Sequence, residues 1–299
     1  MTAAPQPITH SWVARNLPTR HERAHKGDFG RVLVVAGSIE YPGAAVLTGL
    51  GAMRAGAGLV RVAAAESVVA RMSSEVPELT WLPLDEEAPG LIAPGGWRRA
   101  TTETAASDVV VIGPGLGRHP ATHRRTRQLI ASLRVPAVVD ADGLNALAAG
   151  SRWWRDIRTR LVVTPHPGEF ARLRSELVPD ADDDEGRATA AATAAAQWDQ
   201  VVVLKGARTV VAAPDGATMR SDVATPALAT AGSGDVLSGV IGAFVAGGAT
   251  PLAAAACGVA VHAAAGVLAE ERIGATGTMA RDIAGFLPRA IAELRSAAP

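Results

Sequence analysis

Residues 30–37 read Gly-Arg-Val-Leu-Val-Val-Ala-Gly, in which an arginine and an apolar run at 32–36 stand between two glycines. Such a run is typical of a β-strand buried on both faces, which is the kind of strand that builds a parallel sheet. Small residues at helical spacing follow over residues 44–55, and a second strand is predicted at 59–63. The order strand, helix, strand predicts an α/β protein.

The same alternation continues along most of the chain. Two further strands flank Pro-Asp-Gly at 214–216 and predict a hairpin, and three helical patterns follow it, the last over 280–295. We therefore predict a three-layer α/β/α fold around a mainly parallel sheet, in one domain spanning 1–299 with residues 1–20 as an N-terminal extension. The remaining predicted strands lie at 108–112, 137–140, 161–164, 201–204, 209–213 and 217–221.

The composition excludes several classes of protein. The chain has 299 residues, of which 48% are hydrophobic and 19% charged, so it can bury a large α/β core. Lys plus Arg equals Asp plus Glu, which leaves no basic excess to bind nucleic acid. The single cysteine, Cys257, cannot form an internal disulfide, and residues 1–10 lack the apolar core of a signal peptide. These features favour a reducing, cytoplasmic location with a buried thiol.

Two stretches need a separate interpretation. Residues 236–269 contain no Asp, Glu, Lys or Arg and are long enough to span a bilayer, but the break at 247–251 predicts two buried helices and no membrane association. Close packing of such Ala- and Gly-rich helices also suggests a homo-oligomer. The acidic run 180–185 predicts a solvated loop before a helix beyond Arg187.

Residues 228–235 read Leu-Ala-Thr-Ala-Gly-Ser-Gly-Asp and run into an apolar helical pattern. Small residues let backbone N–H groups approach an anion, and the start of a helix adds its positive dipole end. Asp235 on that first turn is expected to stay ionised and to take a proton from a hydroxyl that faces a phosphate. The alternative is a glycine-containing turn whose aspartate only caps the helix.

Gly-rich or polar segments follow most of the predicted strands, and ligands of open parallel sheets bind beyond the carboxyl ends of the strands. The segment 113–117 is similar to a dinucleotide fingerprint, but Arg118 stands where that pattern needs a later glycine, so a Rossmann dehydrogenase is disfavoured. These segments are 37–38, 43–45, 113–117, 140–145, 164–169 and 205–209.

Three side chains in these segments suit a phosphate-handling site. Glu169 could hold a hydrated magnesium ion, with Asp140 or Asp142 helping or replacing it; alternatively, Glu169 caps a helix through residue 173. His166 has no second His or Cys nearby, which favours a substrate hydrogen bond over a zinc site. Lys205 suits contact with a phosphate, although a surface lysine before a turn would look the same.

Taken together, these segments resemble the ADP-dependent NAD(P)H-hydrate dehydratases of the ribokinase-like superfamily, over roughly residues 20–295. Ala231 stands where the family usually has a glycine, and Thr225 where asparagine is common. The segments that carry the resemblance are 27–38, 52–60, 113–117, 140–145, 164–169, 205–209, 232–239 and 262–266.

The resemblance implies a ribokinase-like fold and a repair reaction. Such enzymes use ADP to phosphorylate the ring hydroxyl of the S epimer of hydrated NADH or NADPH (NADHX, NADPHX), then lose phosphate to give NADH or NADPH and AMP. Asp235 would be the base, and Ala44, Gly115 and His166 would contact the hydrate with it. Glu169 would help to place Mg²⁺. The nucleotide would be held by Lys205, Gly206, Ala207, Arg208, Thr209, Gly232, Ser233 and Gly234.

The resemblance also implies a homotetramer and a separate NAD(P)H-hydrate epimerase as functional partner. The family often carries that epimerase as a preceding domain, for which we expect no room before residue 20. Two other functions stay open at this point. One is a ribokinase-like kinase for a vitamin alcohol such as a thiazole or a pyrimidine, and the other is a non-catalytic nucleotide-binding module.

Overall fold

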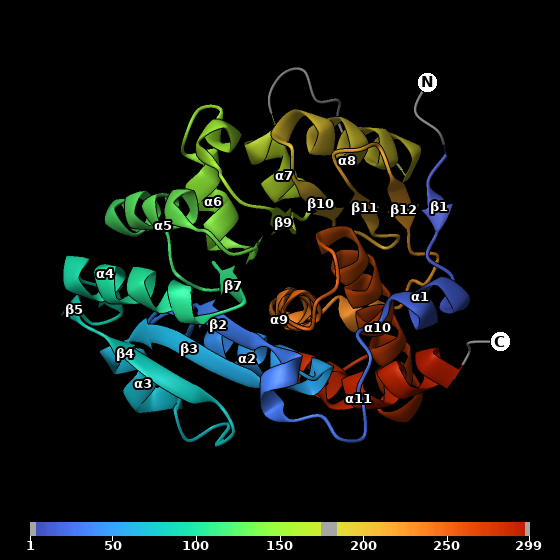
Figure 1. Cartoon of the computed structure of the whole chain (residues 1–299), viewed down its shortest axis with the longest axis horizontal. Helices are drawn as coiled ribbons and strands as arrows, with labels where there is room; N and C mark the ends of the chain where they lie inside the picture. Colours follow the sequence, from blue (N-terminus) through green and yellow to red (C-terminus); the bar gives the residue numbers. More distant parts are fainter. Residues whose placement is uncertain (1–3, 175–183, 297–299) are drawn as a thin grey trace.

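The computed structural model of the chain describes residues 4–174 and 184–296, and the described residues are built around one large sheet (Figure 1). Its ten strands lie in the order β1-β12-β11-β10-β9-β8-β7-β2-β3-β4. They are β1 Gln6–Pro7, β2 Arg31–Val35, β3 Leu59–Ala65, β4 Thr80–Leu84, β7 Val109–Ile112, β8 Ala137–Val139, β9 Leu161–Val163, β10 Val201–Leu204, β11 Val210–Ala212 and β12 Thr218–Arg220. A separate small ribbon pairs β5 Glu86–Ala88 with β6 Leu91–Ile92.

Helices cover both faces of this sheet. Apart from four short 3-10 segments (Lys26–Phe29, Thr104–Ala106, Trp153–Asp156 and Pro226–Leu228), they are α1 His10–Asn16, α2 Pro42–Ala55, α3 Glu66–Met72, α4 Pro94–Glu103, α5 Pro120–Ser132, α6 Asp142–Ala148, α7 Pro167–Leu173, α8 Asp184–Trp198, α9 Ser233–Ala246, α10 Pro251–Arg272 and α11 Ala280–Ser296.

The strand order creates a switch point between β2 and β7. All strands from β10 to β4 pair in parallel, and the hairpin β11–β12 adds antiparallel strands at one side. From β2 the chain proceeds to β3 and β4 in one direction, and from β7 to β10 in the other. Loops that leave β2 and β7 therefore diverge, which opens a crevice at the carboxyl ends of these strands.

Alternate side chains of the buried strands enter two separate cores. On β7, Val109 and Val111 belong to a cluster with α2, α9, α10 and α11, whereas Val110 and Ile112 belong to a cluster with α4 to α8. This two-residue period places one layer of helices on each face. The three-layer α/β/α fold with a mainly parallel sheet, predicted from the sequence, is confirmed.

Helix α9 is held against α2 by two glycines at the helix crossing. A Cβ on Gly239 would lie 2.0 Å from the Thr48 carbonyl oxygen, and one on Gly51 would lie 2.4 Å from the Val236 carbonyl oxygen. Only residues without side chains allow the two backbones to approach this closely. The contact holds the first turns of α9, and with them Asp235, against the middle of α2.

Helices α9 and α10 confirm the prediction of two buried helices separated at residues 247–251. Within the described ranges, α10 is the helix long and apolar enough to cross a membrane, and 72% of its most apolar window is buried in the fold. Cys257 on α10 is buried, and burial raises the pKa of its thiol to about 12. Because the small residues of α10 pack inside the fold, they do not support the homo-oligomer that the sequence suggested.

The predicted strands and the hairpin are all present, with ends displaced by at most a few residues. The short strand β1 and helix α1 pack against β12 and α10, so residues 6–16 contribute to the folded body. Most of the acidic run 180–185 lies outside the described residues. Its last part was predicted as loop but lies in α8, which begins at Asp184.

Candidate active site

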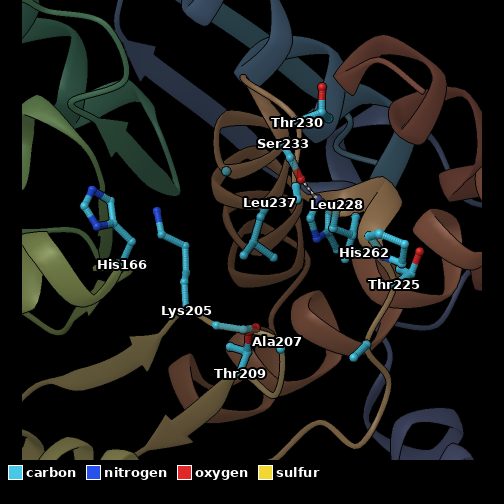
Figure 2. Close-up of a pocket in the computed structure, with 15 residues that line it drawn as sticks. His166, Lys205, Ala207, Thr209, Thr225, Leu228, Thr230, Ser233, Leu237 and His262 are labelled. Atoms are coloured by element: carbon cyan, nitrogen blue, oxygen red, sulfur yellow. Dashed lines mark hydrogen bonds between the residues drawn. The ribbon is translucent and has the colours of Figure 1, made fainter. Parts of the chain in front are cut away.

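Two cavities lie at the carboxyl ends of the parallel strands, one on each side of the first turn of α9. The first, which we call the Lys205 chamber, has a volume of about 530 Å³ and is lined by His166, Lys205, Ser233, Gly234, Leu237, His262 and parts of segments 206–209 and 224–230 (Figure 2). The second, the Asp235 chamber, has a volume of about 510 Å³ and lies in the crevice beside β2 and β7. Its lining is Glu40, Tyr41, Ala44, Gly115, Arg118, Ala141, Asp142, Asn145, Glu169 and Asp235.

The first turn of α9 separates the two chambers. Gly234 faces Lys205, since a Cβ at this position would lie 3.3 Å from Lys205 Nζ and 3.8 Å from Asp140 Oδ2. The next residue, Asp235, lines the other chamber. A group held beside Gly234 and a group held beside Asp235 would therefore be adjacent.

The local sequence explains why α9 begins with an open end. Its N-cap is Gly232, which has a left-handed φ of 84° and no side chain to accept from the first-turn N–H groups. The Ser233 N–H donates to the Thr230 carbonyl at 3.3 Å. Helix N-termini without a capping side chain are suited to bind anions through the remaining amides and the helix dipole.

The pKa of Asp235 is raised to about 7, first by burial and then by the negative charge of Asp140, while Lys205 acts in the opposite direction. The expectation that the helix end keeps this carboxyl firmly ionised is therefore wrong. Loss of solvent and neighbouring carboxylates outweigh the dipole. As a result, Asp235 is a stronger base than an ordinary carboxylate and exchanges its proton near neutral pH.

Lys205 projects from the end of β10 between His166 and the first turn of α9 (Figure 2). Its Nζ donates to Asp140 Oδ1 at 2.9 Å and lies 3.8 Å from Glu169 Oε2. Burial by itself lowers the pKa of Lys205, but Asp140 and Glu169 outweigh it, and the pKa is raised. Lys205 is therefore a fixed positive charge at the junction of the chambers.

Asp140 is 1% exposed and has a partner on each carboxylate oxygen. Oδ1 accepts from Lys205, and Oδ2 accepts from the Ser238 hydroxyl on the second turn of α9. The Asp140 carboxylate thus joins β8, β10 and α9. The sequence had suggested Asp140 only in connection with a metal ion, as an aid to Glu169 or in its place, whereas the structure makes it the centre of a hydrogen-bonded network.

Glu169 caps helix α7, which is the role that the sequence suggested as an alternative to metal binding. The His166 N–H donates to Glu169 Oε2 at 2.8 Å, and the Gly168 N–H donates to His166 Nδ1 at 3.0 Å. Burial raises the pKa of Glu169 despite the nearby charge of Lys205. Among residues 4–174 and 184–296, no three His, Cys, Asp or Glu side chains form a group that could hold a metal ion by themselves.

His262 on α10 is a site residue to which sequence reasoning gave no role. It is 6% exposed, lines the Lys205 chamber, and its Nε2 lies 3.1 Å from Ser233 Oγ, as the dashed line in Figure 2 shows. Burial lowers its pKa to about 4, so the imidazole is neutral at physiological pH. A lone histidine within an Ala-rich helix was the signal that could have drawn attention to it.

The structure divides the predicted site residues between the chambers. Gly232 stands behind the turn, where a Cβ would meet Leu47, and Arg208 is exposed; neither is among the residues that line a chamber. The Asp235 chamber contains Ala44, Gly115, Glu169 and Asp235. The Lys205 chamber contains His166, Lys205, Gly206, Ala207, Thr209, Ser233 and Gly234.

This combination of sheet, flanking helices and glycine-bordered helix start defines the class: the protein has the ribokinase-like fold. The model of the NAD(P)H-hydrate dehydratase family matches residues 32–289, and the chain belongs to that family.

Several known proteins are similar to this chain. It is 39% identical to the ADP-dependent (S)-NAD(P)H-hydrate dehydratase of Xanthomonas campestris over 259 residues, 87% of each chain. It superposes with a TM-score of 0.83 on the ADP/ATP-dependent NAD(P)H-hydrate dehydratase of Bacillus subtilis co-crystallized with ATP/Mg2+, at 32% identity, covering 97% of this chain and 99% of that one.

The chain also matches longer proteins. It is 41% identical to the bifunctional NAD(P)H-hydrate repair enzyme Nnr of Moorella thermoacetica over 96% of this chain and 54% of the relative. The chain therefore spans about half the length of the bifunctional relatives it matches.

Proposed function

We propose that this protein is an ADP-dependent (S)-NAD(P)H-hydrate dehydratase that returns NADHX and NADPHX to NADH and NADPH. The observation that carries the proposal is the position of Asp235. A carboxyl with a pKa near neutrality lines one chamber, and its chain neighbour Gly234 faces Lys205 in the other. An alcohol beside Asp235 and a terminal phosphate beside Gly234 would be in position to react.

In this reaction, ADP occupies the Lys205 chamber with its terminal phosphate toward Lys205 and the start of α9. The ring hydroxyl of the hydrate gives its proton to Asp235 while its oxygen bonds to the terminal phosphorus, and the bond between that phosphorus and AMP breaks. Lys205 and the α9 amides stabilise the charge on the transferring group. Phosphate and a ring proton then leave, and the electrons of the broken C–H bond form the ring double bond of the dihydronicotinamide.

Magnesium suits the donors that face the junction. Mg²⁺ prefers oxygen ligands and usually keeps several waters while binding one or two carboxylates and substrate phosphates. Glu169 offers a buried carboxylate beside Lys205. Its Oε2 accepts from the His166 N–H, and its Oε1 lies 3.5 Å from His166 Nε2. We propose that Glu169 helps to hold the ion, which would neutralise phosphate charge.

Incubation of the protein with (S)-NADHX, ADP and Mg²⁺ tests the function. We expect recovery of the dihydronicotinamide absorbance, with one AMP and one phosphate formed for each hydrate consumed. The Asp235→Asn variant serves as the control for contaminating activity. No recovery, together with turnover of a thiazole or pyrimidine alcohol with ATP, would make the protein a vitamin kinase instead.

We further propose that the protein acts in the cytoplasm as a homotetramer, alongside a separate NAD(P)H-hydrate epimerase that supplies the S epimer. The support is the family membership and, for the reducing compartment, the single buried cysteine. Light scattering tests the assembly, since a monomeric mass contradicts it. Conversion of a mixture of epimers beyond the S fraction by the protein alone would contradict the need for a separate epimerase.

A further inference from the structure

The loop that follows β7 presents Arg118 at the Asp235 chamber. Gly113 in this loop has a φ of 126°, and a Cβ there would lie 1.9 Å from the Asp140 carbonyl oxygen, so the loop lies tightly on the end of β8. At its other end, the Gly117 N–H donates to Asp142 Oδ2 at 2.9 Å. Both ends of the loop are thus anchored on the segment that follows β8, and this fixes the backbone next to Arg118.

The chamber into which Arg118 projects is strongly acidic. Among the described residues that line it, Arg118 carries the one basic side chain. A ligand that brings negative charge into this chamber is repelled by every carboxylate that is ionised, and the repulsion grows as water is displaced. A single cation at the rim is then the natural partner for an anionic group. The acidic side chains of the lining are Glu40, Asp142, Glu169 and Asp235.

The guanidinium of Arg118 is available for such a group. Its side chain is 75% exposed and forms an ion pair with Asp142, in which Nε lies 3.7 Å from Oδ1, a distance too long for a hydrogen bond. The Asp142 carboxylate is already engaged by Gly117 and by Asn145 Nδ2 at 3.0 Å. The guanidinium therefore lies beside the chamber without a hydrogen bond to Asp142, and its planar fork of donors suits phosphate oxygens, which it can bind in pairs.

The start of α2 reinforces the positive potential at the same rim. Tyr41 is the N-cap of this 14-residue helix and makes no side-chain capping bond, and Ala44 in the first turn lines the chamber. The positive end of the α2 dipole thus points toward the space beside Arg118. The floor of the chamber is negative at Asp235, and its rim is positive at Arg118.

We propose that Arg118 is a specificity-determining residue that binds the pyrophosphate of the hydrated dinucleotide while the hydrated ring reaches Asp235. The proposal rests on the proposed function. It explains how an acidic chamber accepts a substrate with an anionic pyrophosphate, and it predicts selection for a dinucleotide over a small uncharged alcohol. Arg118 would contact the two phosphates that NADHX and NADPHX share, so the binding of both hydrates should depend on Arg118 equally.

Steady-state kinetics of Arg118→Ala and Arg118→Lys test the assignment, with Arg125→Ala as the matched control. Arg125 is an exposed arginine on α5 that bonds only to Gln128 among the contacts described for it. For Arg118→Ala we expect the KM for both hydrates to rise by about tenfold or more, because a charge-assisted bidentate contact is lost. The KM for ADP and kcat change by less than about twofold, and Arg118→Lys is intermediate.

Three kinetic results would overturn the assignment. They are an unchanged KM for the hydrates, an equal rise in the KM for ADP, and an effect confined to NADPHX, which would mean that Arg118 binds the extra phosphate of NADPHX.

If the parent protein does not convert the hydrate, the proposed function fails. Calorimetric titration of NADH into protein saturated with ADP then decides the role of Arg118. Binding about tenfold weaker in Arg118→Ala supports it, and equal binding or no binding to the parent overturns it.

Discussion

Lys205 Nζ donates to Asp140 Oδ1 at 2.9 Å, although the two residues are 65 positions apart and lie at the ends of different strands. Asp140 is buried and Lys205 is mostly buried beside the first turn of α9, where the pair contributes to the electrostatic environment of Asp235. Asp140 raises the pKa of Asp235, and Lys205 lowers it. Removing one member of such an ion pair leaves the charge of the other uncompensated. We therefore expect substitution of either residue to lower both activity and stability.

Asp235→Asn is expected to lower turnover of the hydrate by about 100- to 10,000-fold, because the general base is removed while the shape of the site is kept. The affinity for ADP should change little, since the Lys205 chamber remains intact. Single-turnover kinetics and calorimetric ADP binding measure the two effects. Asp215→Asn in the β11–β12 turn is the matched control, and a fully active Asp235→Asn would show that the base is misassigned.

The pH profile of kcat/KM should follow the ionisation of Asp235. A base acts when deprotonated, so kcat/KM rises with pH up to the pKa of about 7 and then levels off. Asp140→Asn removes a negative charge that raises this pKa, and the rising limb should therefore move to lower pH. Initial rates between about pH 5 and about pH 9 test this, and an unmoved limb would argue against coupling between the two carboxyls.

Asp235 should also make the fold less stable at alkaline pH. Its pKa in the folded protein is about 7 against an ordinary 3.8, so the folded state binds the proton more tightly than the unfolded chain, and stability falls as pH rises between these values. The Asp235→Asn variant lacks this carboxyl, so its stability does not fall for this reason as the pH rises. The gain in Tm should therefore be larger at about pH 8 than at about pH 5, measured by calorimetry. A gain independent of pH would contradict the assigned pKa shift.

His262 is expected to hold the Ser233 hydroxyl in the Lys205 chamber. His262→Leu leaves that hydroxyl without its partner at 3.1 Å, and the loss of one hydrogen bond worth about 1 kcal/mol should raise the KM for ADP by about fivefold. His262→Gln keeps a polar partner and should recover part of the affinity.

A double-mutant cycle separates this role from a purely structural one. If the two side chains act together, adding Ser233→Ala to His262→Leu should raise the KM for ADP less than Ser233→Ala does alone. The KM for the hydrate provides the internal control, since its chamber is not lined by either residue. Additive effects on the KM for ADP would exclude a functional Ser233–His262 contact.

Gly113→Ala and Gly216→Ala compare steric conflict with backbone strain alone. Both positions have a positive φ, 126° and 92°, but a Cβ on Gly113 would lie 1.9 Å from the Asp140 carbonyl oxygen, while Gly216 has open space around it. We expect Gly216→Ala to cost about 1 kcal/mol of unfolding free energy and Gly113→Ala about 2 kcal/mol more. Urea denaturation measures both, and equal losses would show that the loop can shift.

Much of the fold could be predicted because its signals are local. Residues 32–36 of the first predicted strand form a continuous apolar run, and the separation of α9 from α10 follows from glycines and Pro251, whose ring fixes the start of the second helix. The short strand β4 was missed, since Thr-Trp-Leu-Pro-Leu contains a proline and lies at the sheet edge. Its pairing with β3 depends on a neighbour that the local pattern does not reveal.

The site was only partly predictable for a related reason. The segment around Gly232 and Asp235 is recognisable because small residues before a helix have few other uses, and the strand-end rule placed Lys205 and Glu169 near it. The charge state of Asp235 was predicted wrongly from its helix alone. His262 was given no role, because no sequence pattern places the middle of α10 against the start of α9.

By itself, the amino-acid sequence determined the alternation of strands and helices, the breaks between them and the family, since periodicity, glycine and proline act through neighbouring residues. The tertiary structure alone decided that Asp140 pairs with Lys205, that Glu169 caps α7, and that Asp235 titrates near neutral pH. The physical reason is that burial and charge interactions depend on distances between groups from remote segments, and those distances exist only once the chain is packed.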